Sequence, residues 1–174
     1  MSAASPSVHA SAVLVGDRAV LVRGPAGAGK SRLAFDLILA GRAGQIPPAT
    51  LVGDDRVHLH TAMGQLIARP APALAGLIEI RGLGIRRCAF AEQAVVGLVV
   101  DLCACDAERL PPPEAMLVRL SGIELPRIPV AAGYAALPLV VAALTMGASS
   151  SSTQPAVDCR KGIGNHMRAS IATE

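Results

Sequence analysis

One short run near the N-terminus combines closely spaced glycines with a lysine and a serine. The spacing G-x-x-x-x-G-K-[ST] is satisfied in full by Gly24-Pro25-Ala26-Gly27-Ala28-Gly29-Lys30-Ser31. Glycines allow a backbone to turn its N–H groups inward around an anion. Lys30 would reach the β- and γ-phosphates of a nucleotide, and the Ser31 hydroxyl would ligate Mg²⁺. The run therefore predicts a site for a nucleoside polyphosphate and its metal ion.

The segments on either side of this run are those that a phosphate-binding loop requires. The residues before it, "AVLVR", have the composition of an apolar strand. The residues after it predict a helix from Ser31 to about Gly41, with Leu33, Leu37 and Ile38 on one stripe. The N-terminus of that helix would add its positive dipole end to the anion site.

Two further segments carry charged residues that could act on a phosphate. "LVGDDRV" places Asp54 and Asp55 at the end of an apolar strand, where carboxylates commonly hold Mg²⁺ or accept the proton of an attacking hydroxyl. An ordinary turn would carry such a pair too, and only the neighbouring loop favours the functional interpretation. "LIEIRGLGI" places Glu79 and Arg81 on one face of a strand, where spacing alone favours an exposed, ion-paired edge.

The rest of the chain predicts one α/β domain followed by a tail. "SAVLVGDRAVLVRG" predicts a hairpin that turns at Gly16-Asp17, and "AVVGLVVDLCA" predicts a buried strand. The nearly uncharged segment Ala131–Gly147 predicts a buried helix, because it contains Pro138 and is shorter than the ~20 apolar residues of a membrane span. From residue 148 to residue 174 the serine-rich composition predicts a flexible tail.

Composition excludes several classes of protein. Of the 174 residues, 52% are hydrophobic and 17% charged, which favours a folded core over disorder. Aromatic residues make up only 2%, and the net charge is +3, so stacking on single-stranded nucleic acid is disfavoured. The start of the chain has no secretory signal. We therefore expect a cytoplasmic protein with reduced cysteines, no nucleic-acid partner and no membrane partner.

Taken in order, His9, "GPAGAGKS", "LVGDDRV", "LIEIRGLGI" and "RIPVAAG" resemble the catalytic domain of the HPr kinase/phosphorylase family. The resemblance runs roughly from His9 to Gly147, with "VVDL", "AERL" and "LPRIPV" also in order. It implies a P-loop nucleotide-binding fold of the phosphoenolpyruvate-carboxykinase-like type, with a mixed sheet and flanking helices. It also implies that residues 1–147 form the catalytic domain, without the N-terminal domain that many members carry.

The resemblance implies a protein-serine kinase that uses ATP and Mg²⁺. Members transfer the γ-phosphoryl group of ATP to a serine of HPr, the small phosphocarrier protein of the sugar phosphotransferase system. Many also run the reverse phosphorolysis, in which inorganic phosphate removes the serine phosphate and pyrophosphate is released. Members are typically hexamers, so a homo-oligomer is implied here as well.

Each implied role falls on a residue that matches the family's motifs. Asp54 would be the base that deprotonates the serine hydroxyl and, in reverse, the acid that protonates it, while Asp55 would support the metal. Glu79 would hold Mg²⁺ together with Ser31. Lys30 would belong to the catalytic group through its charge on the phosphates.

Two more residues take implied roles, and one departs from the family. His9 would lie near the transferred phosphate, and Arg81 would balance the charge of phosphate or acceptor. His58 and His60 are left as surface residues. Tyr134 stands where the family usually has an arginine in "IPV-x-PGRN", which puts the reverse reaction in doubt.

Two other functions stay open at this stage. One is a P-loop kinase of a small metabolite, although the chain has no second arginine-rich lid segment: Arg86 and Arg87 are the only adjacent basic pair before the tail. The other is a regulatory module that binds a nucleotide without transferring phosphate. A retained base at Asp54 favours transfer over the binding module.

Overall fold

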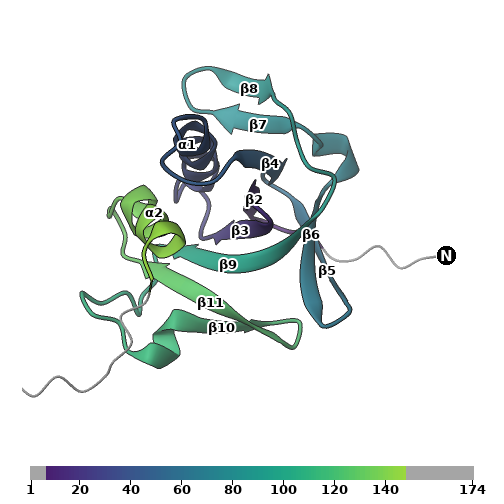
Figure 1. Ribbon diagram of the computed structural model, residues 1–174. Coiled ribbons are helices and arrows are strands. Elements are labelled where there is room, and N and C mark those ends of the chain that lie inside the picture. Colours follow the sequence, from purple (N-terminus) through teal and green to yellow (C-terminus); the bar gives the residue numbers. More distant parts are fainter. Residues whose placement is uncertain (1–6, 148–174) are drawn as a thin grey trace, which may run out of the picture.

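The computed structural model describes residues 7–147 of the chain. Within this range a nine-stranded mixed sheet carries two α-helices, and a separate two-stranded hairpin lies beside it (Figure 1). The predicted tail, residues 148–174, lies outside the described residues. The predicted mixed sheet with flanking helices is confirmed.

The phosphate-binding loop connects β3, which lies inside the sheet between β9 and β2, to the first helix. The strands of the sheet are β1 (Ser7–Val8), β2 (Ser11–Val15), β3 (Arg18–Arg23), β4 (Ala49–Gly53), β5 (Val57–Ala62), β6 (Gln65–Pro70), β9 (Ala94–Leu102), β10 (Leu117–Leu120) and β11 (Ile123–Val130). The hairpin is made of β7 (Leu77–Ile80) and β8 (Gly84–Arg87). The α-helices are α1 (Lys30–Arg42) and α2 (Ala136–Thr145), and the short 3₁₀ turns are Pro72–Leu74 and Pro113–Met116.

The centre of the sheet is parallel and its margins are antiparallel. The strand order is β1-β5-β6-β9-β3-β2-β4, and β11 pairs with β9 and β10. β3 and β11 both run parallel to β9, so the carboxyl ends of these three strands meet at one edge. β2 and β3 form the predicted hairpin, with Val13 opposite Val20. Loops that follow the carboxyl ends of parallel strands are where α/β proteins usually bind ligands.

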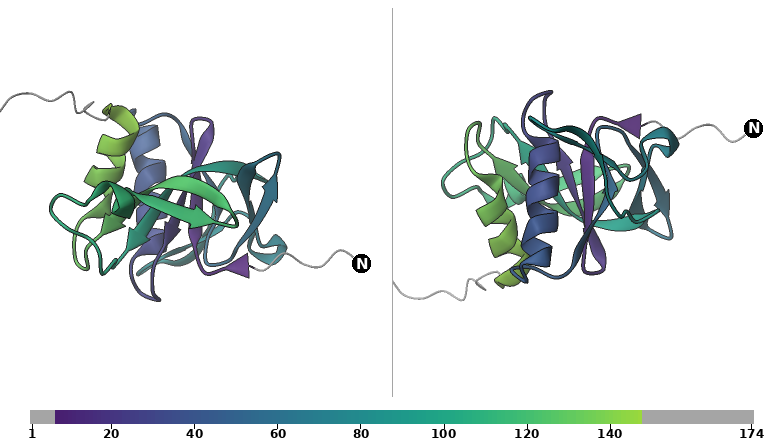
Figure 2. Two further views of the ribbon diagram at one scale, coloured as in Figure 1. Left: turned by 90° about the horizontal axis from the view of Figure 1, so that it is seen from below. Right: turned by 90° about the horizontal axis from the view of Figure 1, so that it is seen from above.

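Two apolar clusters fill the two faces of the sheet. α1 and α2 lie side by side on one face (Figure 2) and bury Leu37 and Val140 against β2, β3, β9 and β11. On the other face, Leu21, Val57 and Leu66 belong to a second cluster that includes residues of β5, β6 and β10. The core is built from aliphatic side chains, as the shortage of aromatic residues requires.

Two sequence predictions need correction. The helix within Ala131–Gly147 is half-buried rather than buried, because only Ala136 and Val140 are enclosed and Pro138 lies on an open side. Strand β6 was not predicted, although it pairs with both β5 and β9. Its sequence "QLIARP" mixes polar residues and a terminal proline into the strand, which conceals the alternation.

Candidate active site

The phosphate-binding loop connects the end of β3 to the start of α1. Gly29 has a φ of 95° and directly precedes α1, a left-handed conformation that a residue with a side chain rarely adopts. At Gly24 a Cβ atom would lie 2.9 Å from the carbonyl oxygen of Leu102, so the close contact with β9 requires glycine. The loop is therefore held in place on both sides. The first N–H groups of a helix have no partner within it, and at the start of α1 Lys30 and Ser31 line a cavity.

Lys30 occupies the position that a phosphate-binding lysine requires. It is 6% exposed, and its Nζ donates hydrogen bonds to the carbonyl oxygens of Gly24 (3.0 Å) and Pro25 (2.9 Å). The ammonium group is thus folded over the loop from the first turn of α1. Ser31 follows it at the edge of the same cavity.

A cavity of about 740 Å³ lies over this loop. Its volume is in the range of small-molecule sites, which is roughly 300–1,000 Å³. Most of the residues predicted from the sequence to form the site line it: His9, Ala26, Gly27, Gly29, Lys30, Ser31, Asp55, Glu79 and Arg81. The predicted residues outside its lining are Gly24, Pro25, Ala28 and Asp54. The structure thus brings together side chains from four separate segments of the chain.

Asp54, for which we predicted the base, does not line this cavity. Its side chain is 3% exposed, and each oxygen accepts a hydrogen bond: Oδ1 from the Ser11 hydroxyl (2.5 Å) and Oδ2 from the backbone N–H of Glu79 (3.1 Å). Ser11 is itself completely buried. A carboxylate in this setting is held in place by two hydrogen bonds and is closed to solvent. The role of Asp54 as the base stays a prediction, and this placement does not favour it.

The neighbouring carboxylate has the opposite placement. Asp55 is 63% exposed at its side chain, and its Oδ1 lies 3.2 Å from Nε2 of His9, which is 44% exposed. Both residues line the cavity. Asp55 has a φ of 65°, which is uncommon for a residue with a side chain, and the turn that it makes separates its direction from that of Asp54. This His–Asp pair therefore lines the same cavity as the phosphate-binding loop.

Ser11 and Asp54 connect the segments that carry the cavity residues. Ser11 lies two positions after His9, Asp54 directly precedes Asp55, and the third partner is the N–H of Glu79 itself. Among the described residues, the buried polar side chains are those of Ser11, Asp54 and Lys30, and all three lie at this site. Sequence analysis missed Ser11. Its signal was a lone hydroxyl in the apolar run "HASAVLV".

The hairpin β7–β8 forms one wall of the cavity. It contributes Glu79 and Ile80, the last two residues of β7, and Arg81, which lies in the turn that follows and not on the strand as predicted. No cluster of three or more His, Cys, Asp or Glu side chains that could hold a metal exists among residues 7–147. Mg²⁺ normally binds through one or two carboxylates together with substrate phosphates and water. A donor set of Glu79 and Ser31 beside the phosphate loop fits that mode.

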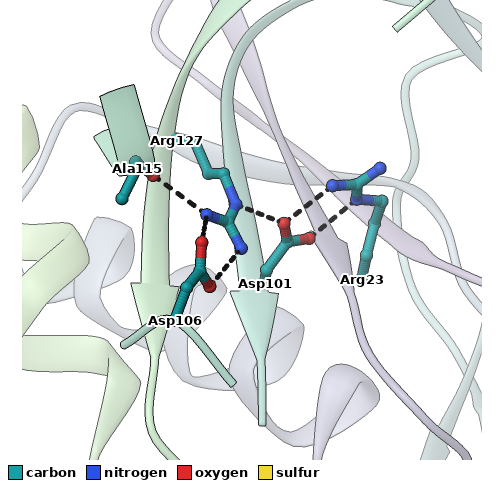
Figure 3. A network of polar contacts seen from close by, with 5 residues as sticks. All are labelled: Arg23, Asp101, Asp106, Ala115 and Arg127. Atoms are coloured by element: carbon teal, nitrogen blue, oxygen red, sulfur yellow. Dashed lines mark hydrogen bonds and ion pairs between the residues drawn. The ribbon is translucent and has the colours of Figure 1, made fainter. Parts of the chain in front are cut away.

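A second polar network fixes the strands from which the loop emerges (Figure 3). Arg23, the last residue of β3, donates to Asp101 through Nε and Nη2, each at 2.7 Å. Arg127 of β11 donates its Nε to the same carboxylate at 2.6 Å and holds Asp106 with its two Nη atoms. Arg127 also donates to the carbonyl oxygen of Ala115. The network thereby links the parallel strands β3, β9 and β11, and its member Arg23 directly precedes Gly24.

The charges of this network perturb its members. Burial acts to raise the pKa of Asp101, but hydrogen bonds from Arg23 and Arg127 outweigh it and hold that pKa below its ordinary value of 3.8. The hydrogen bond from Arg127 likewise lowers the pKa of Asp106, and the same contact raises the pKa of Arg127. Sequence analysis did not single out these residues. The signal available was a set of charged residues inside otherwise apolar strand segments.

Other predicted features lie away from the cavity. His58 and His60 are half-buried on β5, and neither lines it. Cys88 is half-buried, which raises the pKa of its thiol, and Cys103 and Cys105 are exposed rather than in the core. All three are free thiols. Within the described residues, neither α-helix has the length and apolar character needed to cross a membrane.

Comparison with known proteins identifies the family. The profile of the HPr serine kinase C-terminal domain matches residues 1–158. The chain belongs to this family. The chain is 28% identical over 160 residues to an HPr kinase/phosphorylase of Mycoplasma mycoides subsp. mycoides and 35% identical over 167 residues to one of Enterococcus faecalis. In both cases 84% of the chain is matched.

A solved structure supports the same assignment. The HPr(Ser) kinase/phosphatase of Coxiella burnetii is 28% identical to the chain and superposes with a TM-score of 0.64. The match covers 80% of this chain and 93% of that one. The chain spans only about half of the length of the curated relatives, 49% of the Mycoplasma protein and 51% of the Enterococcus protein.

Proposed function

We propose that the protein is an ATP-dependent kinase that phosphorylates a serine of an HPr-type phosphocarrier protein. Residues 1–147 would form its catalytic domain, with the phosphoenolpyruvate-carboxykinase-like variant of the P-loop fold. The observation that carries the proposal is the meeting of a phosphate-binding loop with an open His–Asp pair in one cavity. A module that only bound a nucleotide would need the loop and not the pair.

The loop and the start of α1 bind and orient the triphosphate. Lys30 and the helix N-terminus bring positive charge to the β- and γ-phosphates, and phosphoryl transfer depends mainly on such positioning and charge neutralisation. When bound between Ser31, Glu79 and the phosphates, Mg²⁺ would neutralise negative charge that develops on the transferred group. Arg81, on the opposite wall, would meet the remaining charge of phosphate or acceptor.

Asp55 is the residue that we propose as the base. Its carboxylate faces the cavity and is open enough to accept a hydroxyl proton from an incoming serine. The imidazole of His9 orients this carboxylate, with Nε2 of His9 3.2 Å from Oδ1 of Asp55. The serine oxygen then attacks the γ-phosphorus, the bond to the bridging oxygen of ADP breaks, and the proton stays on Asp55 until it leaves to water. In reverse, the same group would return a proton to the serine oxygen.

Asp54 takes a positioning role in this scheme. Its hydrogen bonds with Ser11 and with the N–H of Glu79 fix the turn that carries Asp55. Tyr134, which is 65% exposed after β11, stands where the family's arginine is expected, and we propose that the reverse reaction with inorganic phosphate is weak. A hexamer of the kind typical in the family also remains a proposal.

The direct test is transfer of labelled phosphate from ATP to HPr-type carriers in the presence of Mg²⁺, with the modified residue located by mass spectrometry. Label on a carrier serine is expected. If no carrier accepts phosphate but ATP still binds, the regulatory module becomes the better description. Label on a small metabolite instead would favour the metabolite kinase.

Two variants of nearly equal shape separate the roles of the acids. Asp55→Asn removes the open proton acceptor, so its rate should fall by about 10²–10⁴-fold while its thermal stability stays near that of the unmodified protein. Asp54→Asn should lower the stability clearly, because it changes a buried, doubly bonded carboxylate. Full activity of Asp55→Asn would exclude it as the base and reopen the case for Asp54.

A further inference from the structure

A second cavity adjoins the first at the beginning of α1. Its volume is about 300 Å³, and it shares Gly29, Arg32 and Asp36 with the cavity over the loop. Its far side is formed by Leu102 at the end of β9 and by Tyr134 in the turn between β11 and α2. The two cavities therefore adjoin at the last glycine of the phosphate-binding loop and at the residues that follow the loop.

We propose that this second cavity binds the nucleobase of the nucleotide, with Tyr134 as its stacking platform. The inference rests on the proposed function, since it requires that a nucleoside triphosphate occupy the loop. It adds the position of the base, the residue that holds it and the selectivity among nucleotides, none of which the reaction itself specifies.

The placement of the charged groups sets the direction of the nucleotide. The transferred phosphate must lie near Asp55, which follows β4, on the β2 side of β3. Leu102 ends β9 and Tyr134 follows β11, and both strands lie on the other side of β3. A triphosphate that crosses the loop with its terminal phosphate toward Asp55 therefore directs its nucleoside end toward the second cavity.

The lining of the second cavity suits a flat, weakly polar ligand. Tyr134 is 65% exposed and is the only tyrosine of a chain that has no tryptophan and two phenylalanines. The other contacts are largely aliphatic, such as Leu33, Leu102 and Leu137. Aromatic and aliphatic surfaces of this kind bind any base through its face.

The polar side chains in the lining offer little to distinguish one base from another. Arg32 and Asp36 are paired with each other, with Nε 3.3 Å from Oδ2. Because selectivity between bases needs hydrogen bonds that are directed to the base edge, we expect ATP and GTP to bind within a few-fold of each other.

The test compares two ligands that share the phosphates and differ in the base. ATP and inorganic tripolyphosphate, each with Mg²⁺, are titrated calorimetrically into the unmodified protein, Tyr134→Ala and Tyr134→Phe. Tyr134→Ala should raise the Kd of ATP by roughly 5- to 100-fold, which is the usual effect of one aromatic–base contact. Its Kd for tripolyphosphate should stay within about two-fold, and Tyr134→Phe should bind both ligands normally.

The lone tyrosine supplies a second, independent signal. Since the chain has one tyrosine and no tryptophan, its emission reports Tyr134 itself. ATP should change that emission, and tripolyphosphate should not. Because the nucleotide itself absorbs light, the same titration of free tyrosine amide supplies the correction.

The outcomes separate the two hypotheses. If Tyr134→Ala binds ATP normally, or weakens ATP and tripolyphosphate equally, Tyr134 does not hold the base and the inference fails while the loop stands. Phe35, an aromatic residue that lines the first cavity, provides the matched comparison. An ATP-specific loss in Phe35→Leu, with none in Tyr134→Ala, would place the base in the first cavity. Absence of binding of both ATP and tripolyphosphate by the unmodified protein would overturn the proposed function itself.

Discussion

Asp101→Asn is expected to weaken the fold at the root of the phosphate-binding loop. The Asp101 carboxylate is 15% exposed and accepts three hydrogen bonds from two guanidinium groups, at 2.6–2.7 Å. The asparagine keeps one acceptor oxygen but turns an NH₂ group toward a guanidinium that also donates. It leaves the four-residue network with one uncompensated positive charge.

The size of the effect follows from these contacts. Loss of one partner of a buried ion pair costs about 3–5 kcal/mol, and each hydrogen bond to a charged group contributes about 1.5–3 kcal/mol. Arg127 keeps Asp106, and Arg23 is 30% exposed, so both cations retain some solvation or pairing. We therefore expect the free energy of unfolding at pH 7 to fall by about 3 kcal/mol, near the lower end of the range for a buried pair.

Urea unfolding followed by circular dichroism measures this change. With a slope of roughly 1.5–2 kcal/mol per molar, the midpoint should fall by about 1.5–2 M. Glu124→Gln is the matched control, because its pair with Arg119 spans 3.9 Å between side chains that are 59% and 72% exposed. Such a surface pair contributes less than about 1 kcal/mol.

The pH dependence provides a further check with a definite sign. Because the pKa of Asp101 is lowered in the folded protein, its charge stabilises the fold above the unfolded pKa of about 3.8. That contribution is lost as the pH falls through the lower folded value. The stability gap between unmodified protein and Asp101→Asn should therefore be constant from pH 7 to about pH 5 and shrink below pH 4. A loss under about 1 kcal/mol at pH 7, or a gap that does not shrink in acid, would refute this account.

Two further predictions concern the phosphate and metal sites. Lys30→Met keeps the aliphatic volume of a side chain that is 6% exposed but removes its charge, so tripolyphosphate and ATP affinity should both fall at least tenfold in calorimetric titrations. Unchanged affinity for both ligands would exclude the loop around Lys30 as the phosphate-binding site. Glu79→Gln should raise the Mg²⁺ concentration that gives half-maximal transfer, with little change in metal-free nucleotide binding, because it removes charge and keeps shape. If the variant shows the Mg²⁺ dependence of the unmodified protein in a transfer assay, Glu79 is an exposed acid of the strand and not a metal ligand.

The sequence was most informative where a local rule determines the structure. The strand, loop and helix around Lys30 were predicted because the glycine spacing of the loop is a local pattern, in which Gly29 supplies a left-handed conformation directly before the helix. The hairpin at Gly16-Asp17 was predicted for a similar local reason. In contrast, β6 and the Arg23–Asp101–Arg127 contacts depend on partners that lie far apart in sequence. No local pattern specifies such partners.

The acid pair shows why adjacency in sequence does not settle chemistry. Asp54 and Asp55 have the same side chain and are adjacent in sequence, yet Asp54 is 3% exposed as a residue and the side chain of Asp55 is 63% exposed. The difference arises from the positive φ of Asp55, which turns the chain at the end of β4, and from the Ser11 hydroxyl that captures Asp54. A buried carboxylate is tolerated only where donors satisfy both oxygens, and here one donor comes from β2 and the other from β7. The hydrogen bonds that shield Asp54 from solvent also fix the turn in which Asp55 lies, and Asp55 lines the cavity over the phosphate-binding loop. The position of the proposed base is therefore set by the packing of its neighbour.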